Sequence, residues 1–245
     1  MGLIFTLNSY GAFNVGICAW IFAIPLIRYI NIRTKWSSIF LMLLGMVVVA
    51  NITFFRLVED NFNVMNFVFC TLNGIRIWLP FLVYFLCRKT NTNKLISYFA
   101  FPASVAICEF FIDNPFVGII TSLSVSQFWN LGLMQVASVT GVVGVSFIVT
   151  LLASVVNYVM ENGFKKSTLS VLLIYSVFVI VVTGVGMANV NKGKISTLDK
   201  TVRVATAVDD MGAHFNEYKD NLDAFYDKSM EIISQRATEA VINGS

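Results

Sequence analysis

The chain has 245 residues, of which 57% are hydrophobic and only 13% are charged. A soluble domain carries about 25% charged residues, so this composition argues against an ordinary water-soluble protein and favours a membrane protein. The formal net charge of +3 conceals a basic segment, residues 1–197, and an acidic one, residues 198–245. No basic cluster is interleaved with aromatic residues, so we expect no nucleic acid partner.

Apolar segments of about 20 residues, the length that crosses the hydrocarbon core of a bilayer, recur along residues 1–197. They are Gly11–Ile30, Ser37–Leu57, Val64–Cys87, Leu95–Ile112, Leu133–Met160 and Leu169–Ala188. The stretch Asp113–Asn130 is less apolar and contains Asn114-Pro115, which predicts a loop or re-entrant segment at the membrane surface. The sequence therefore predicts an all-α polytopic membrane bundle of about six transmembrane helices.

Basic residues gather in alternate loops of this predicted bundle. Those after the first, third and fifth helices are Arg28, Arg33, Lys35, Arg88, Lys89, Lys94, Lys165 and Lys166. The other two loops carry Arg56 with Glu59 and Asp60, and Asp113. Because cytoplasmic loops are enriched in Lys and Arg, we expect the basic loops to be cytoplasmic. The N-terminus and residues 198–245 are then extracytoplasmic in a multi-pass protein of the cell membrane.

Among the charged residues inside predicted spans, Arg76 lies near the middle of the third and Glu109 near the outer end of the fourth. A charge in hydrocarbon is costly unless it is paired, so both side chains should face protein or water. A pair between them is one interpretation. Their depths differ by about eight residues, or roughly 12 Å at helical rise, which favours a structural anchor role for Glu109.

The sequence predicts no metal site and no cofactor. Its cysteines, Cys18, Cys70, Cys87 and Cys108, lie within or beside apolar segments and show no C-x-x-C spacing. The single histidine, His214, follows a predicted strand and has no partners for a metal site. We interpret the cysteines as small buried hydrophobic side chains.

The acidic segment has the pattern of a soluble α/β unit. Thr201–Val208 is short and rich in β-branched residues, which predicts a strand. Between Phe215 and Val241 apolar residues recur at helical spacing, with charges on the other face. One strand and one helix cannot bury a core of their own. We therefore interpret residues 198–245 as the truncated start of an α/β domain that follows the membrane bundle.

The stretch from Pro102 to Asn157 resembles the apolipoprotein N-acyltransferase family. That family has a proline, a glutamate before an aromatic residue, a Ser-Gln pair and a Gln-x-Ala-x-x-x-Gly-x-x-Gly-x-Ser-Phe run. The matching positions here are Pro102, Glu109, Phe110, Ser126, Gln127, Gln135, Ala137, Gly141, Gly144, Ser146 and Phe147. The tail is similar to the first strand of the family's nitrilase-like domain. The chain departs from the pattern at Phe110, Ile112 and Asp209, where the family has Trp, Arg and Gln.

This resemblance implies an acyltransferase that moves a fatty acyl chain from a membrane phospholipid to the N-terminal amine of lipoproteins. It also implies a Glu–Lys–Cys triad in the nitrilase-like domain. No residue of this sequence matches the triad, so we assign no catalytic residue and expect the 245-residue fragment to be inert. Gln127 and Gln135 are candidates for substrate binding on a lipid entry route. The alternative is that both are hydrogen-bonded polar residues at a helix end.

Two other functions fit a polytopic protein. A transporter usually shows internal repeats and several polar positions at the bilayer midplane. This sequence shows no repeat, and Arg76 is its one midplane charge. A non-catalytic membrane scaffold would leave the apolar stripe of the predicted tail helix exposed, which is unfavourable in water. The acyltransferase interpretation is therefore preferred.

Overall fold

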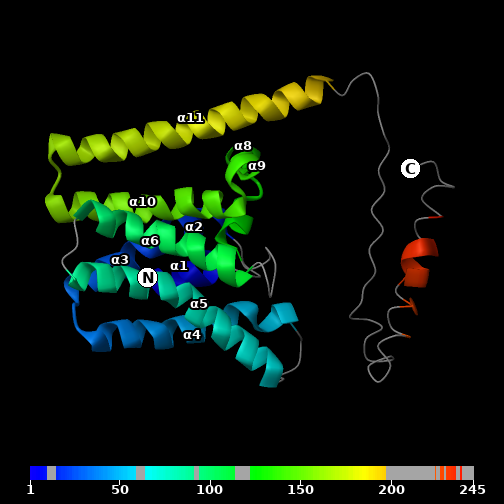
Figure 1. Ribbon diagram of the computed structural model, residues 1–245, viewed down its shortest axis with the longest axis horizontal. Helices are drawn as coiled ribbons and strands as arrows, with labels where there is room; N and C mark the ends of the chain where they lie inside the picture. The colour runs from blue at the N-terminus through cyan, green and yellow to red at the C-terminus, as the bar shows by residue number, and fades with distance from the viewer. Residues whose placement is uncertain are drawn as a thin grey trace. The chain divides into compact units, whose positions relative to one another are not determined.

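The computed structural model describes residues 1–9, 15–58, 64–90, 94–113 and 122–196. In the C-terminal segment it describes residues 224, 227–228, 230–235 and 238. The chain divides into two units, Met1–Lys192 and Gly193–Ser245, and each is considered by itself. The first unit is a bundle of helices (Figure 1).

The regular structure of the described residues is entirely helical. The elements are α1 (Gly2–Ser9), α2 (Gly16–Ile21), α3 (Ala23–Ile32), α4 (Trp36–Val58), α5 (Val64–Lys89), α6 (Lys94–Cys108), η1 (Glu109–Asp113), η2 (Leu123–Gln127), α8 (Leu131–Met134), α9 (Ala137–Thr140), α10 (Val142–Asn162) and α11 (Lys166–Ser196). A helix satisfies every backbone hydrogen bond within its own segment, which is what an apolar sequence in lipid requires.

Four helices of the described part are long and apolar enough to cross a membrane: Trp36–Thr53, Asn66–Lys89, Val142–Asn162 and Lys166–Lys192. They correspond to the second, third, fifth and sixth predicted spans. The first and fourth predicted spans are represented by shorter apolar helices, Gly16–Ile32 and Tyr98–Phe111. The structure thus supports a polytopic helical bundle, with fewer full-length spans than the six that hydropathy predicts.

The fifth predicted span begins later than the sequence suggests. Leu133–Met160 was expected to be continuous, but Gly141 adopts a φ of 69° and ψ of 176°, a conformation that favours glycine. This turn separates α8 and α9 from α10, so the long helix begins at Val142. Ala137 and Gly141 are spaced like the small residues of a helix-packing motif, but the turn at Gly141 ends α9, so they do not form a packing face within one long helix. A Cβ atom on Gly141 would meet no neighbour within 4 Å.

The core of the bundle is formed mainly where α5 packs against α4 and α6, and where α10 packs against α6. At its centre the ring of Phe81 lies 4.7 Å from that of Phe101 and 6.4 Å from that of Phe22, measured between centroids. Gly74 allows α4 and α5 to approach closely, because a Cβ atom there would lie 2.7 Å from Cα of Val47. Small residues at helix interfaces have this role in membrane proteins.

Helix α11 differs from the other long helices because most of its surface is exposed. Its apolar side chains include Leu173, Ile174 and Ile180, which are among the exposed large hydrophobic residues. A helix that is apolar on all sides and little buried by protein is the pattern of a lipid-facing span. Its specific contacts include a hydrogen bond of 2.8 Å from Tyr175 Oη to the carbonyl of Ile148.

Side-chain contacts bring the ends of α4, α5 and α10 together. Arg88 Nη2 lies 3.0 Å from Glu161 Oε1, and Tyr98 Oη donates to Glu161 Oε2 at 2.9 Å. Lys89 Nζ lies 4.6 Å from the ring centroid of Trp36. We call this end of the bundle, which carries Arg33, Lys35, Arg88, Lys89, Lys165 and Lys166, the basic end.

In the second unit, residues 227–228 and 230–235 are helical and fall within the helix predicted from Phe215 to Val241. Lys228 and Glu231 form an exposed ion pair of 2.9 Å there. The predicted strand Thr201–Val208 lies outside the described residues. No strand occurs among the residues that the structure describes, so the expected α/β segment is not confirmed.

Candidate functional site

Glu109 lies where α6 gives way to the π-helix η1, and its side chain is only 5% exposed. Ser122 Oγ donates a hydrogen bond to Glu109 Oε2 at 2.9 Å, and the backbone N–H of Leu123 donates to Oε1 at 2.8 Å. Both carboxylate oxygens are therefore engaged by the residues that begin η2. Single π-turns within helices are frequent at functional sites, and this one aims Glu109 into the protein.

Serine hydroxyls extend this contact to α10. Ser122 Oγ lies 2.8 Å from Ser124 Oγ and 3.4 Å from Ser146 Oγ, and Ser124 N–H donates to Ser146 Oγ at 3.1 Å. We call Glu109, Ser122, Ser124 and Ser146 the Glu–Ser cluster. It connects α6, η2 and α10, and Ser146 within it is fully buried. The cluster supplies the polar partners that an irregular segment within an apolar bundle requires.

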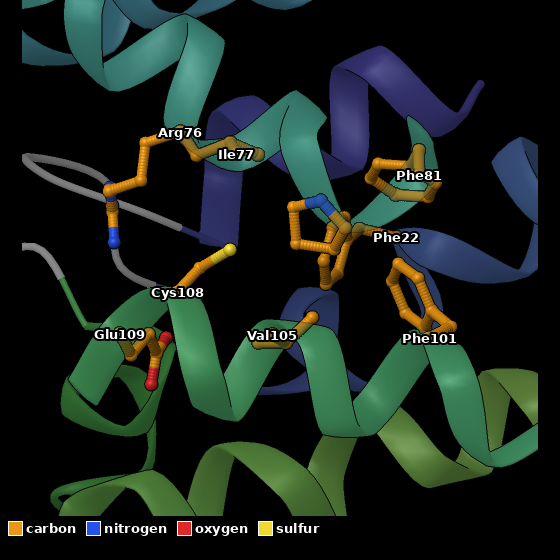
Figure 2. Close-up of a pocket in the computed structure, with 9 residues that line it drawn as sticks. Phe22, Arg76, Ile77, Phe81, Phe101, Val105, Cys108 and Glu109 are labelled. Atoms are coloured by element: carbon orange, nitrogen blue, oxygen red, sulfur yellow. The ribbon is translucent and has the colours of Figure 1, made fainter. Parts of the chain in front are cut away.

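Arg76 of α5 is also buried and lies beside Glu109. Both residues line one small cavity of about 10 Å³, shown in Figure 2 with Phe22, Ile77, Phe81, Phe101, Val105 and Cys108. The two opposite charges attract each other. The sequence predicts a difference of about eight residues in their depth, yet both side chains line the same cavity. The two residues that the sequence singled out as intramembrane charges are thus brought together.

Gln127, a predicted substrate-binding residue, joins η2 to α2. Its Oε1 accepts a hydrogen bond from Trp20 Nε1 at 2.9 Å. Its Nε2 donates to the carbonyl of Gly16 and to Ser126 Oγ, both at 2.9 Å. Gly16 permits this approach, because a Cβ atom there would lie 2.9 Å from the Ser126 carbonyl oxygen. Both N–H groups of the Gln127 amide are therefore used in holding the fold.

An open pocket of about 580 Å³ lies beside this junction. We call it the amphipathic pocket; it is lined by Gly16, Ile17, Trp20, Ile21, Ser126, Gln127, Trp129, Asn130 and Leu152. Its walls are mainly apolar with a few amide and indole groups, and Trp129 is 83% exposed. Its volume falls within the range of about 300–1,000 Å³ that is typical of small-molecule sites. The arrangement suits a ligand with a polar part and an apolar chain.

Gln135, the other predicted substrate-binding residue, lies in the turn between α8 and α9 and is partly buried. It does not line the amphipathic pocket. Its Cβ atom faces α11, where a Cβ atom added to Gly186 would lie 3.1 Å away. Gly186 also approaches Gly132 so closely that an added Cβ atom would overlap the Gly132 carbonyl oxygen. Gln127 and Gln135 therefore lie in different parts of the bundle, Gln127 at the amphipathic pocket and Gln135 beside α11.

The sequence did not single out Ser122, Ser124, Trp20 or Asn130 as site residues. A signal for the serines exists in the alternating run Ser122-Leu-Ser-Val-Ser-Gln, which places hydroxyls at every second position. The partnership of Trp20 with Gln127 joins residues 107 apart, and no local pattern indicates it.

No group of three or more metal-ligating side chains occurs among the residues that the structure describes. Of the four cysteines, Cys70 and Cys108 are buried, and Cys18 and Cys87 are partly exposed. The candidate site is therefore defined by carboxylate, hydroxyl, amide and indole groups.

Comparison with known protein families gives one match. The model of the apolipoprotein N-acyltransferase N-terminal domain matches residues 1–155. This range contains the Glu–Ser cluster, Arg76 and the residues of the amphipathic pocket. No curated protein and no solved structure matches the chain. Since the family model covers more than half of the sequence, the chain belongs to the family of the apolipoprotein N-acyltransferase N-terminal domain.

Proposed function

We propose that this chain is the membrane part of an acyltransferase that transfers a fatty acyl chain from a phospholipid to the N-terminal amine of lipoproteins. The observation that carries the proposal is the family match over residues 1–155, which encloses every residue of the amphipathic pocket. A site in the bundle that accepts a lipid from the bilayer is what such an enzyme requires.

The lining of the amphipathic pocket suits the phospholipid donor. Ile17, Ile21 and Leu152 offer apolar contacts for an acyl chain. Asn130 Oδ1 accepts a hydrogen bond from the N–H of Leu133 at 3.1 Å, which orients the Asn130 amide at the edge of the pocket. Its Nδ2 group then donates to an ester carbonyl of the bound lipid. Trp129 lies in the polar–apolar boundary, where exposed indoles are favoured.

Gln127 acts in this proposal as a positioning residue. Its hydrogen bonds to Trp20 and Gly16 fix two walls of the pocket relative to each other. The Glu–Ser cluster holds the other side of η2 through Glu109 and Ser146. Gln135 contributes a second polar position near α11, on the route by which lipid enters. The pocket is thereby organised before any ligand binds, which lowers the entropic cost of binding.

The covalent chemistry is expected in a nitrilase-like domain, where the resemblance implies a Glu–Lys–Cys triad. A thiolate nucleophile, a carboxylate base and a cation that stabilises the oxyanion are a coherent set for acyl transfer. No residue of the printed sequence is assigned to this triad, so we expect the 245-residue chain alone to be inactive. We propose that the basic end faces the cytoplasm and that residues 198–245 lie on the extracytoplasmic face.

Depletion of the protein in its source organism tests the proposed activity. Mass spectrometry of lipoprotein N-terminal peptides is expected to show peptides that are lighter by one amide-linked acyl chain and carry a free α-amine. Unchanged N-acylation after complete depletion would contradict the proposal and favour a scaffold.

A matched pair of variants tests the role of the pocket in the same assay. Ile17 and Ile180 are both 70% exposed, but only Ile17 lines the amphipathic pocket. Replacement of Ile17 by Trp fills the pocket and is expected to lower lipoprotein N-acylation by about tenfold, whereas Ile180→Trp leaves it unchanged. Equal activity of both variants would contradict the placement of the donor lipid.

A further inference from the structure

A second polar cavity lies at the basic end, where α3 is joined to α4. Its volume is about 440 Å³, and its lining residues are Tyr29, Ile32, Arg33, Thr34, Lys35, Ser37 and Ser38. We call it the basic cleft. The amphipathic pocket shares none of these residues. The family match and the proposed acyl transfer assign no role to the basic cleft.

The charges around the basic cleft are positive. Arg33 and Lys35 line it, and no acidic residue does. Neither of their side chains forms an ion pair with another residue of the described part. Glu161, an acidic residue at this end, is already engaged by Arg88 and Tyr98. Two unpaired cations in one concave site create a positive potential that attracts an anion.

Hydrogen-bond donors face the same cleft. Helix α4 begins at Trp36 and runs for 23 residues, so the N–H groups of Trp36 and Ser37 have no acceptor within the helix. Such a helix start favours a bound anion. The Ser38 side chain lines the cleft and is only 8% exposed, and its hydroxyl has no hydrogen-bond partner among the described residues. This hydroxyl lies in an open cleft without a partner in the described part of the chain, so it can donate to a ligand bound there.

The surroundings place the basic cleft at the level of lipid headgroups. Trp36 is 53% exposed beside it and is covered by Lys89, with 4.6 Å between Nζ and the ring centroid. Exposed tryptophan and lysine together mark the boundary between hydrocarbon and water. Ile32 and Phe40 offer exposed apolar surface next to the cations. A lipid bound here would therefore have protein contacts for both its headgroup and its acyl chains.

We propose that the basic cleft binds the phosphate group of an anionic phospholipid in the leaflet at the basic end. The phosphate oxygens accept hydrogen bonds from Arg33, Lys35 and the Ser38 hydroxyl, and from the first N–H groups of α4. The acyl chains lie along the exposed apolar surface of α3 and α4. This lipid is a bound structural ligand, separate from the acyl donor in the amphipathic pocket.

Native mass spectrometry of the purified protein in detergent tests this site, with phosphatidylglycerol as the probe and phosphatidylcholine as the neutral comparison. The double variant Arg33→Gln/Lys35→Gln is expected to bind phosphatidylglycerol at least about tenfold more weakly than the parent. Ser38→Ala is expected to weaken it by a few-fold. The control Lys165→Gln/Lys166→Gln removes the same charge at the same end but outside the cleft, and is expected to bind like the parent.

Each alternative outcome is informative. An equal loss in both double variants would overturn the proposal and leave a general attraction between the basic end and anionic lipid. Glycerol phosphate that competes with phosphatidylglycerol at equal concentration would assign the cleft to a soluble phosphate compound instead. Circular dichroism of each variant establishes that it is folded. If Arg33→Gln/Lys35→Gln does not fold, Ser38→Ala tests the proposal by itself. An unchanged affinity of Ser38→Ala for phosphatidylglycerol would then contradict the proposed contact.

Discussion

Helix α11 and the segment that contains η2 satisfy their backbone hydrogen-bonding groups in opposite ways. Both lie in an apolar protein, where an unsatisfied backbone group is costly. Helix α11 is one continuous helix of 31 residues whose backbone satisfies itself. The 3-10 helix η2 is short, and side chains of the Glu–Ser cluster accept hydrogen bonds from its backbone N–H groups at Leu123 and Ser124. Irregular backbone in a membrane protein thus requires dedicated polar partners, and these mark where a site can be built.

The sharpest test of this contrast is removal of the carboxylate of Glu109. Glu109→Ala leaves the buried N–H of Leu123 without its acceptor, removes the acceptor of Ser122 Oγ, and removes the negative charge beside Arg76. We expect a loss of about 3–5 kcal/mol in the free energy of unfolding, measured by SDS titration in mixed micelles. Glu109→Gln, which keeps an acceptor and the side-chain volume, should be milder. Equal stability of the parent and the alanine variant would contradict the role of the cluster.

The second test removes the amide that joins η2 to α2. Gln127→Leu loses the hydrogen bonds to Trp20, Gly16 and Ser126 while keeping a similar volume. We expect a stability loss of about 2 kcal/mol by the same titration, because buried partners are left unsatisfied. Trp20 should also become more accessible to a water-soluble quencher. A matched control is Gln235→Leu, whose amide bonds only the exposed Glu231.

The third test concerns the close approach of the α11 backbone to the α8 backbone at Gly186 and Gly132. Gly186→Ala puts a Cβ atom against the Gly132 carbonyl, whereas Gly184→Ala meets nothing within 4 Å. We expect Gly186→Ala to destabilise by about 1–3 kcal/mol through overpacking, and Gly184→Ala to be neutral. Thermal unfolding of the two variants side by side gives the difference. Identical midpoints would show that α11 does not rest on α8.

The smallest effect is expected on the exposed face of α11. Ile174 is 66% exposed, so Ile174→Val exchanges one lipid-facing apolar side chain for another. Its free energy of unfolding should change by less than about 0.5 kcal/mol. A larger loss in the same SDS titration would mean that another protein surface covers this face.

The positions of the continuous spans could be predicted from the sequence, because a long apolar segment is sufficient to form a transmembrane helix. Helices α4, α5 and α11 overlap the predicted segments closely for this reason. The span expected from Leu133 was wrong at its start, because hydropathy carries no information about the positive φ of Gly141. The first and fourth predicted spans include residues outside the described part, and their described portions form shorter apolar helices.

The site could be predicted only in part. The sequence singles out Glu109 as a charge inside a predicted span, and the family resemblance includes Glu109, Gln127 and Ser146, but neither indicates what these side chains contact. Their partners come from segments far apart in the chain, as in the hydrogen bond between Trp20 and Gln127. The meeting of Arg76 with Glu109 depends on helix packing and on the reach of a long side chain. These are tertiary properties, so no local pattern could have given them.

The glycine at position 74 has a mechanical consequence. It lets the backbones of α4 and α5 approach so closely at Val47 that a side chain at position 74 would not fit, and we therefore expect this pair of helices to move together. On the opposite flank, α11 rests on its neighbours through few contacts, among them Tyr175 and the glycine pair with α8. We therefore expect the bundle to bend most easily along α11. If the proposed function is correct, this flank is where a lipid tail would enter against the least elastic resistance.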